Sequence, residues 1–294
     1  MSFASTSQIV CGALRLMLSI GVVYGMPQDL GGFRSLPVLA TEGGPEFTYR
    51  STDQKSSPYG PSEWHLGYVE CAGTRQSPIN LSAATEIDAP ASDYALQFFP
   101  ASCSSAELHY EVDDHFYKVD FSSCSEVPSL SFRGVSYDLL QLHFHSASEH
   151  LIGSTHHDAE VHLVHLQQGT DDKLLVVGVL IDATEFGDNV QISNLWSVLN
   201  LDKSSMADLA FVSSPYDLVP STPTYAHYIG SLTTPPCTEG VRWVVFTEPT
   251  LMRALHLEQY RDHVSRVIHT KVDERGNTCR PEQALNGRIV KFVS

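Results

Sequence analysis

The chain has 294 residues, of which 42% are hydrophobic and 18% are charged, so it can bury a sizeable core. It carries 34 acidic residues against 18 basic residues, which gives a formal net charge of −16. This charge argues against nucleic acid as the main partner, because phosphate binding needs a cationic surface. It argues equally against docking on an anionic membrane.

The first 25 residues are predicted to be a secretory signal peptide. Residues Ile9 to Gly25 are largely apolar, and no acidic side chain precedes residue 26. The apolar run after Arg15 is shorter than the roughly 20 residues that span a bilayer, so we expect no membrane span in the mature chain. A leader that is disordered or that lies on the membrane surface is the alternative. Residues 26–45 are rich in Gly and Pro and are predicted to be a linker or propeptide.

Residues 46–294 are predicted to form one β-rich domain with peripheral helices. Short apolar or alternating runs of strand length are separated by turn residues, and no second linker divides them. Two longer stretches, Val190–Leu199 and Glu258–His269, have the spacing of helices. The predicted strands are Phe116–Phe121, Leu139–His145, Ala159–Leu166, Leu174–Ile181 and Val241–Phe246.

Cysteine usage fits a secretory protein without a structural zinc knuckle. Loss of Cys11 with the signal peptide leaves five cysteines, and none forms a Cys-x-x-Cys pair. Because five is odd, at most two bridges form within one chain, and one thiol stays free or pairs between chains. The sequon Asn80-Leu81-Ser82 permits glycosylation, but the tight segment Gln76–Asn80 predicts a poorly accessible amide.

Three histidines are spaced so that neighbouring strands can bring them together. His143 and His145 lie two residues apart on one predicted strand and therefore share a face. An antiparallel pairing with the next strand brings His162 to that face. Three imidazoles without a thiolate suit Zn²⁺ in a tetrahedral site whose fourth position is left for water. Gln141 and Glu160 each lie two residues before a proposed ligand and can hold its second ring nitrogen.

A His-x-His pair in a strand is also common as two half-buried polar residues with no metal. By the same reasoning His156 and His157 are predicted to be a solvated loop pair, and His165 is predicted to be structural on the opposite face. The third histidine and its acidic neighbour at strand spacing favour the metal site.

Several separate motifs occur along the chain. They are Gly60-Pro61-Ser62-Glu63-Trp64, Arg75–Asn80, Gln141–His150, Glu160–His165, Gly230–Glu239, Trp243, Arg280-Pro281 and Leu285–Arg288. In this order they resemble the motifs of the α-class carbonic anhydrases. The resemblance runs from about Tyr49 to Lys291, and the short loop between His145 and Glu149 resembles bacterial, algal and plant members. It implies an α+β, mainly β fold: a single domain around a large, mostly antiparallel mixed twisted sheet with short peripheral helices.

The resemblance implies an enzyme that reversibly hydrates carbon dioxide to bicarbonate and a proton by means of zinc-bound hydroxide. His143, His145 and His162 would be the zinc ligands, with Gln141 and Glu160 behind them. Thr233 would accept a hydrogen bond from the hydroxide and donate its own proton to ionised Glu149, because a carboxylate can only accept. Zinc lowers the pKa of bound water to about 7 in carbonic anhydrases, which are the established example of this effect. Sulfonamides and other anions are the implied inhibitors.

The resemblance also implies an apolar wall for carbon dioxide and a histidine that shuttles protons. His115, in Val112-Asp113-Asp114-His115, is the predicted shuttle, His109 is the alternative, and an exposed histidine without a role is the other alternative for both. Tyr49 matches a tyrosine that orders water in the pocket. Ordinary core packing is the alternative for the wall, above all for Val176. The predicted wall residues are Val164, Val176, Leu232, Thr234, Val241 and Trp243.

The resemblance implies one disulfide, and the positions of two further cysteines predict a second. Cys71 and Cys237 occupy positions that are bridged in secreted relatives, and Cys103 and Cys124 flank the predicted hairpin of His115 as a second pair. Cys279 would then be the free thiol. The expected location is therefore secreted, or a secretory-pathway or periplasm-like compartment.

Two other functions compete with the enzyme. One is a non-catalytic, carbonic-anhydrase-like binding or matrix module, and the other is a zinc hydrolase that acts on esters. Family members that lost activity usually lost a zinc-binding histidine, whereas this chain keeps all three together with Glu149 and Thr233. The sequence therefore favours the carbon dioxide hydrating enzyme.

Overall fold

The computed structural model describes residues 44–51, 57–83, 85–101, 103, 109–112, 117–121, 123–186, 189, 192, 214–222, 224–267, 272–273 and 275–294. These residues all belong to one compact unit, Ser35–Ser294. The predicted signal peptide lies outside the described residues, and so do the predicted linker except Gly44 and Pro45 and the predicted helix 190–199 except Ile192.

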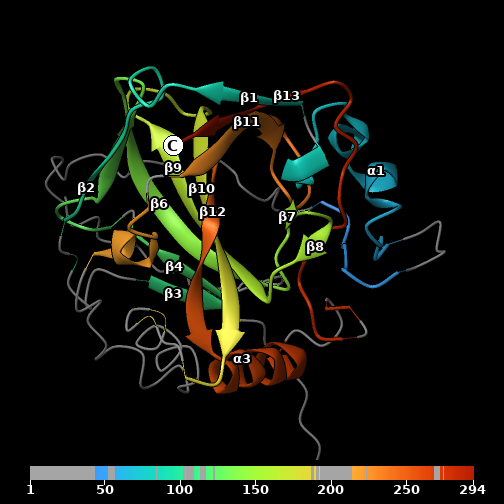
Figure 1. The fold of residues 1–294 in the computed structure, drawn as a ribbon. Coiled ribbons are helices and arrows are strands. Elements are labelled where there is room, and N and C mark those ends of the chain that lie inside the picture. Colours follow the sequence, from blue (N-terminus) through green and yellow to red (C-terminus); the bar gives the residue numbers. More distant parts are fainter. Residues whose placement is uncertain are drawn as a thin grey trace, which may run out of the picture. The chain divides into compact units, whose positions relative to one another are not determined.

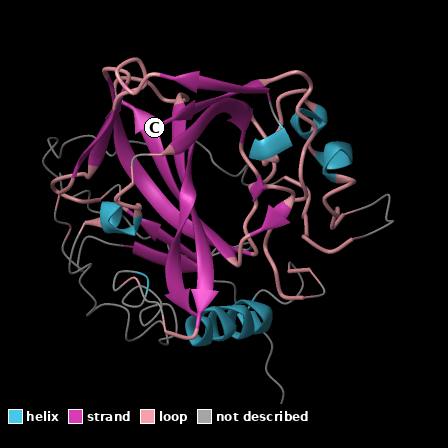
Figure 2. Ribbon diagram, viewed as in Figure 1, coloured by secondary structure: helices cyan, strands magenta, loops and turns pink. Residues whose placement is uncertain are grey.

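Strands dominate the described part of the chain (Figure 2). Eleven of the described strands form one sheet, with the central order β1-β13-β11-β12-β10-β9-β6-β4-β3 and with β5 joining β2 to β6 (Figure 1). The pairs β1–β13 and β10–β12 are parallel, and the other pairs of described strands in this sheet are antiparallel. The predicted mainly β fold with a mostly antiparallel mixed sheet is confirmed.

The strands are β1 (Thr85–Ala89), β2 (Leu96–Phe99), β3 (His109–Val112), β4 (Tyr117–Asp120), β5 (Ser129–Phe132), β6 (Val135–Ser146), β7 (Leu151–Ile152), β8 (Thr155–His156), β9 (Ala159–Gln167), β10 (Leu174–Thr184), β11 (Tyr225–Ser231), β12 (Glu239–Arg253) and β13 (Ile289–Val293). The helices are α1 (Trp64–Gly67) and α3 (Ala254–Val267), and the 3-10 turns are η1 (Val69–Ala72), η2 (Leu81–Ala83) and η4 (Pro215–Leu218).

The five predicted strands correspond to β4, β6, β9, β10 and β12, with different ends. Strand β6 begins at Val135, where Val135 and Ser136 are both exposed, so the burial pattern there does not alternate. Helix α3 begins at Ala254, directly after β12, although helical spacing predicted a start at Glu258. The Tyr260 hydroxyl donates to the Phe144 carbonyl at 2.9 Å, which ties α3 to β6. No described helix has the length and apolar character needed to cross a membrane.

Apolar residues on the two faces of the sheet belong to different core clusters. In β9, Val161 and Leu163 join the larger cluster, while Val164 joins the other cluster together with Trp243 of β12. This separation follows from strand geometry, because successive side chains point to opposite faces. His162 lies between Val161 and Leu163 and therefore projects from the same face as Val164.

Both predicted disulfides are present in the structure: Cys71 is bonded to Cys237, and Cys103 to Cys124. The first bridge lies in a small cluster with Phe47, Tyr49 and Trp64. Cys279 is the free cysteine among the described residues, and burial raises the pKa of its thiol to about 12. The thiol therefore stays protonated at neutral pH.

The sequon asparagine is held inside the fold. Asn80 is 4% exposed, and its side-chain amide donates to the Ser154 hydroxyl at 2.8 Å. This agrees with the poor accessibility that the sequence predicts.

Candidate metal centre

Strands β6 and β9 bring three histidines to one place. They pair antiparallel, with His143 opposite His162 and His145 opposite Glu160. All three imidazoles are buried, and one ring nitrogen from each lies within 4.8 Å of the other two. The convergence follows from the two-residue period of the strands and from this register.

Each of the three rings is oriented by a hydrogen bond to its other nitrogen. His143 Nδ1 lies 2.8 Å from Gln141 Oε1, and His162 Nε2 lies 2.9 Å from Glu160 Oε1. His145 Nδ1 bonds to the carbonyl oxygen of Thr278. Because these oxygens accept, the bonded nitrogens carry the hydrogens. The lone pairs therefore lie on Nε2 of His143, Nε2 of His145 and Nδ1 of His162.

Burial keeps the three rings in the form that binds metals. Desolvation lowers the pKa of His143 well below its usual range, lowers that of His145 to about 4, and lowers that of His162. A metal ligand must be the neutral imidazole. Three neutral nitrogens with fixed tautomers fit a zinc ion, which prefers nitrogen donors in a tetrahedral arrangement.

Glu160 supports this centre by accepting hydrogen bonds from one of the three histidines and from the neighbouring residues Glu149 and His150. Its Oε1 accepts from His162 Nε2 and from His150 Nδ1 at 2.8 Å, and its Oε2 accepts the backbone N–H groups of Glu149 and His150 at 2.8 Å each. Burial raises the pKa of Glu160, but the interactions with His150 and His162 outweigh it and hold that pKa well below its usual range. A Cβ on Gly178 of β10 would lie 2.8 Å from Glu160 Oε1, so a larger residue there would displace this carboxyl.

Replacing Glu160 with glutamine is expected to weaken zinc binding roughly 10- to 100-fold, the usual effect of changing an outer partner of a ligand. The amide keeps one oxygen acceptor, but its NH2 group cannot accept the hydrogen bonds now made to the other oxygen. Competition with a chromophoric zinc chelator measures the change. An unchanged zinc dissociation constant would show that Glu160 does not support the ligand.

Glu149 lies beside the ligand nitrogens. Its Oε2 is 3.6 Å from His145 Nε2 and 4.0 Å from His162 Nδ1, and its Oε1 accepts the backbone N–H of Arg280 at 2.8 Å. Burial raises the pKa of Glu149 to about 7, against the opposing effects of His162, the Thr233 hydroxyl and the Arg280 N–H. A dication at the three nitrogens would favour the carboxylate form further.

The structure brings Thr233 next to Glu149. Thr233 follows β11 and is 5% exposed, and its hydroxyl lowers the pKa of Glu149. The turn after Thr233 ends at Cys237, which is disulfide-bonded to Cys71. The Cys237 backbone N–H donates to the Thr234 carbonyl at 2.9 Å. The carboxyl, the hydroxyl and the histidines therefore belong to one buried site.

Most of the predicted apolar wall lies on the same face of the sheet as the histidines. The Trp243 ring centre is 4.8 Å from that of His162, and the Trp243 N–H donates to the Ser231 carbonyl at 3.0 Å. Leu232 packs against this cluster from a partly exposed position, and Thr234 is half-buried. The buried wall residues that share the cluster are Val164, Val176, Val241 and Trp243.

The remaining residues singled out from the sequence either lie outside the described residues or are not shown to contact the three histidines. His115 lies outside the described residues, and His109 lies in β3. Tyr49 is buried against Trp64, with ring centres 5.8 Å apart. His165 is buried on the opposite face, where its Nε2 is 3.1 Å from the Tyr216 hydroxyl, as expected of a structural histidine.

Four groups near the site are not predicted from the sequence to take part in it. His150 and Arg280 lie within the family-like motifs, whereas the Thr278 carbonyl and Tyr228 lie outside them. The Tyr228 hydroxyl is 2.7 Å from His150 Nε2. The buried histidine of the Ser148-Glu149-His150 motif is the signal that could have found this outer partner.

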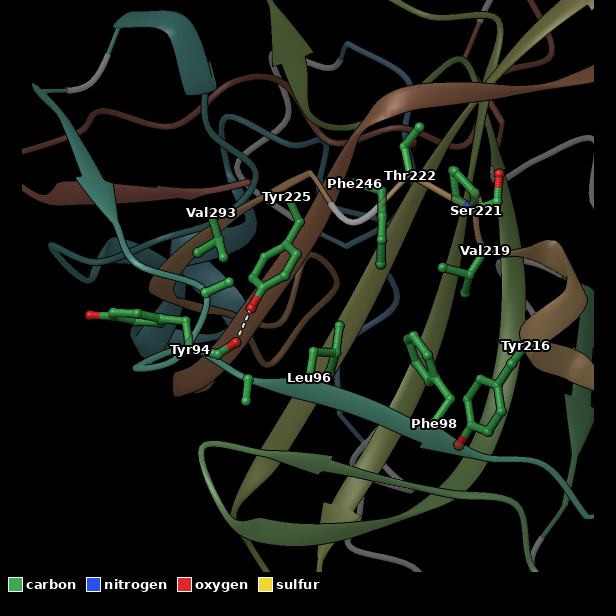
Figure 3. A pocket seen from close by; sticks show the side chains of 13 residues that line it. Tyr94, Leu96, Phe98, Tyr216, Val219, Ser221, Thr222, Tyr225, Phe246 and Val293 are labelled. Atoms are coloured by element: carbon green, nitrogen blue, oxygen red, sulfur yellow. Dashed lines mark hydrogen bonds between the residues drawn. The ribbon is translucent and has the colours of Figure 1, made fainter.

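An apolar pocket of about 470 Å³, shown in Figure 3, is lined mostly by residues of the larger core cluster and by residues packed against it. Its lining includes Phe246 of β12, which belongs to the larger cluster. The adjacent Val245 belongs to the other cluster, on the histidine side, together with Trp243. Figure 3 shows the Tyr225 hydroxyl bonded to the Tyr94 carbonyl at one side of this pocket. The pocket and the candidate metal centre are therefore separated by the sheet.

Comparisons with known proteins agree on one family. A sequence model described as "Eukaryotic-type carbonic anhydrase" matches residues 59–294. Carbonic anhydrase 7 of Mus musculus is 32% identical over 254 residues, which cover 79% of this chain and 93% of that protein. A hyperthermostable carbonic anhydrase from a hydrothermal vent chimney superposes with a TM-score of 0.67 at 28% identity, covering 85% of this chain and 100% of that one. The α-carbonic anhydrase of Thermovibrio ammonificans, solved with the inhibitor sulfanilamide, gives a TM-score of 0.60 at 30% identity, covering 85% of this chain and 100% of that one.

Proposed function

Because this chain belongs to the eukaryotic-type carbonic anhydrase family, we propose that it is a zinc enzyme that reversibly hydrates carbon dioxide to bicarbonate and a proton. The observation that carries the proposal is the convergence of three neutral, buried imidazole nitrogens within 4.8 Å of one another. His143, His145 and His162 would hold the metal, and Gln141, Glu160 and the Thr278 carbonyl orient them.

Zinc would supply a Lewis acid that makes a water molecule nucleophilic at neutral pH. The chain's own residues orient the reactants. As a carboxylate, Glu149 accepts a hydrogen bond from the Thr233 hydroxyl, so the Thr233 oxygen is left to accept a hydrogen bond from the attacking oxygen. The apolar side chains of Val164, Val241 and Trp243 suit carbon dioxide, because this substrate is itself apolar.

Proton removal after each turnover is proposed for His115, because histidine titrates near neutral pH. His115→Ala is expected to slow turnover mainly in weak buffer, and added imidazole is expected to restore the rate. Stopped-flow carbon dioxide hydration at several buffer concentrations measures this effect. His109→Ala is the parallel variant, and exposed His65 of α1 provides the control His65→Ala. A His115→Ala rate that equals the wild-type rate at every buffer concentration would assign the transfer to another group.

Stopped-flow hydration of carbon dioxide by the purified protein, together with metal analysis, tests the proposed function. We expect one zinc per chain and hydration that sulfonamides inhibit, in line with the sulfanilamide complex of the Thermovibrio ammonificans enzyme. Bound zinc without hydration would instead favour a non-catalytic module. Ester hydrolysis that exceeds carbon dioxide hydration would favour a hydrolase.

We also propose that residues 1–25 are a cleaved signal peptide, that residues 26–45 are a linker or propeptide, and that residues 46–294 are the catalytic domain of a secreted protein. Two disulfides within the described residues support an oxidising compartment. Expression of the full chain in a secreting host tests this proposal. N-terminal sequencing of protein from the medium should begin at Met26, whereas retention in the cytosol with Met1 intact would contradict it.

A further inference from the structure

The backbone of one segment holds two groups of the candidate metal centre. The Thr278 carbonyl accepts from His145 Nδ1, and the Arg280 N–H donates to Glu149 Oε1 at 2.8 Å. Neither contact uses the side chain of the residue that makes it. The orientation of His145 and of the Glu149 carboxyl therefore depends on the path of the backbone through this segment.

Asp273 closes a turn just before Thr278. Its Oδ1 accepts the backbone N–H groups of Arg275 and Asn277 at 2.7 Å each, and its Oδ2 accepts from the Asn277 side-chain amide at 3.0 Å. The Asp273 N–H also donates to the Asn277 carbonyl at 3.0 Å. One carboxylate thus binds three donors of a turn that ends one residue before the carbonyl that contacts His145.

The same turn is docked against the end of β6. The Ser146 hydroxyl donates to the Gly276 carbonyl at 3.2 Å, and the Thr278 N–H donates to the Ser146 carbonyl at 2.7 Å. Gly276 has φ +77°, and a Cβ there would lie 2.5 Å from the Ser265 hydroxyl oxygen, so both conformation and space require glycine. Because Ser146 follows His145 directly, the turn and the ligand are fixed to each other.

We propose that Asp273 is a positioning residue of the metal centre: its carboxylate fixes the backbone at Arg275 and Asn277 and thereby the Thr278 carbonyl that orients His145. The inference rests on the proposed function for the identity of the metal. Its physical basis is that outer partners fix the tautomer and orientation of a ligand imidazole. Asp273 acts indirectly, through the backbone that carries the Thr278 carbonyl.

The test is the zinc dissociation constant of the folded full chain, measured by competition with a chelator. Asp273→Ala removes all three acceptor contacts, and we expect it to raise this constant roughly 10-fold, the lower end of the range for outer partners. Asp273→Asn keeps one oxygen that can accept the two backbone N–H groups, so we expect partial rescue. Thr170→Ala is the matched control, because Thr170 supports a different turn through its hydroxyl bond to the Gln167 carbonyl at 2.9 Å.

A second measurement separates positioning from general stability. The ring Nδ1–H signal of His145 in a ¹⁵N-labelled sample should show faster exchange with water in Asp273→Ala but not in Thr170→Ala. Unchanged zinc affinity and an unchanged His145 signal in folded Asp273→Ala would overturn the inference. If Asp273→Ala does not fold, Asn277→Ala removes only the contact to Oδ2 and is held to the same two readouts. Wild-type protein that binds no zinc would instead refute the proposed function itself.

Discussion

His162→Ala is expected to abolish both zinc binding and carbon dioxide hydration. His162 supplies one of the three converging nitrogens and is the ligand that links the centre to Glu160. Two imidazoles cannot provide the three protein ligands of a catalytic zinc site. Metal analysis and stopped-flow hydration of the purified variant measure the two losses together.

The control for this variant is His65→Ala, because His65 is exposed in α1 and far from the paired strands β6 and β9 in the sequence. It should keep one zinc per chain and the wild-type rate. Full activity in folded His162→Ala would refute the assignment of His162 as a ligand.

Loss of the disulfide between Cys71 and Cys237 should cause the largest change in stability. The bridge joins residues 166 positions apart, so in the chain-entropy account its removal lowers the free energy of unfolding by about 5 kcal/mol. Denaturant unfolding of the double variant Cys71→Ala/Cys237→Ala measures the loss. Activity should fall as well, because the bridge closes the segment that carries Thr233 and Thr234.

The second disulfide gives a matched comparison within the same chain. Cys103 and Cys124 are 21 positions apart, so Cys103→Ala/Cys124→Ala should cost less, about 3 kcal/mol. Equal losses for the two double variants would show that loop length does not determine their contributions in this protein.

The convergence of the three histidines was predictable because it depends on strand period and on the pairing of two neighbouring strands. His143 and His145 share a face by strand period alone, and the antiparallel register then places His162 beside them. The partners Gln141 and Glu160 are visible for the same reason, since each lies two residues from the ring that it contacts. The spacing of residues within two strands therefore predicts both the cluster of histidines and the hydrogen bonds to Gln141 and Glu160.

The support for His145 was not predictable from the residues. Its partner is the backbone carbonyl of Thr278, 133 positions away. Every residue type has such a carbonyl, so the residue type gives no sign of this contact. The parallel pairing of β10 with β12 could not be predicted either, because it depends on long-range contacts rather than on the pattern within either strand. The start of α3 at Ala254 was missed because the strand β12 runs into the helix without a turn signal between them.

A crystal structure of the zinc-loaded protein, with anomalous diffraction measured at the zinc absorption edge, is the decisive test of the proposed metal centre. We expect a single strong anomalous peak about 2.0–2.1 Å from His143 Nε2, His145 Nε2 and His162 Nδ1. We also expect solvent rather than a side chain in the fourth coordination position. A peak elsewhere, or a fourth protein ligand that closes the site, would refute the proposed zinc site.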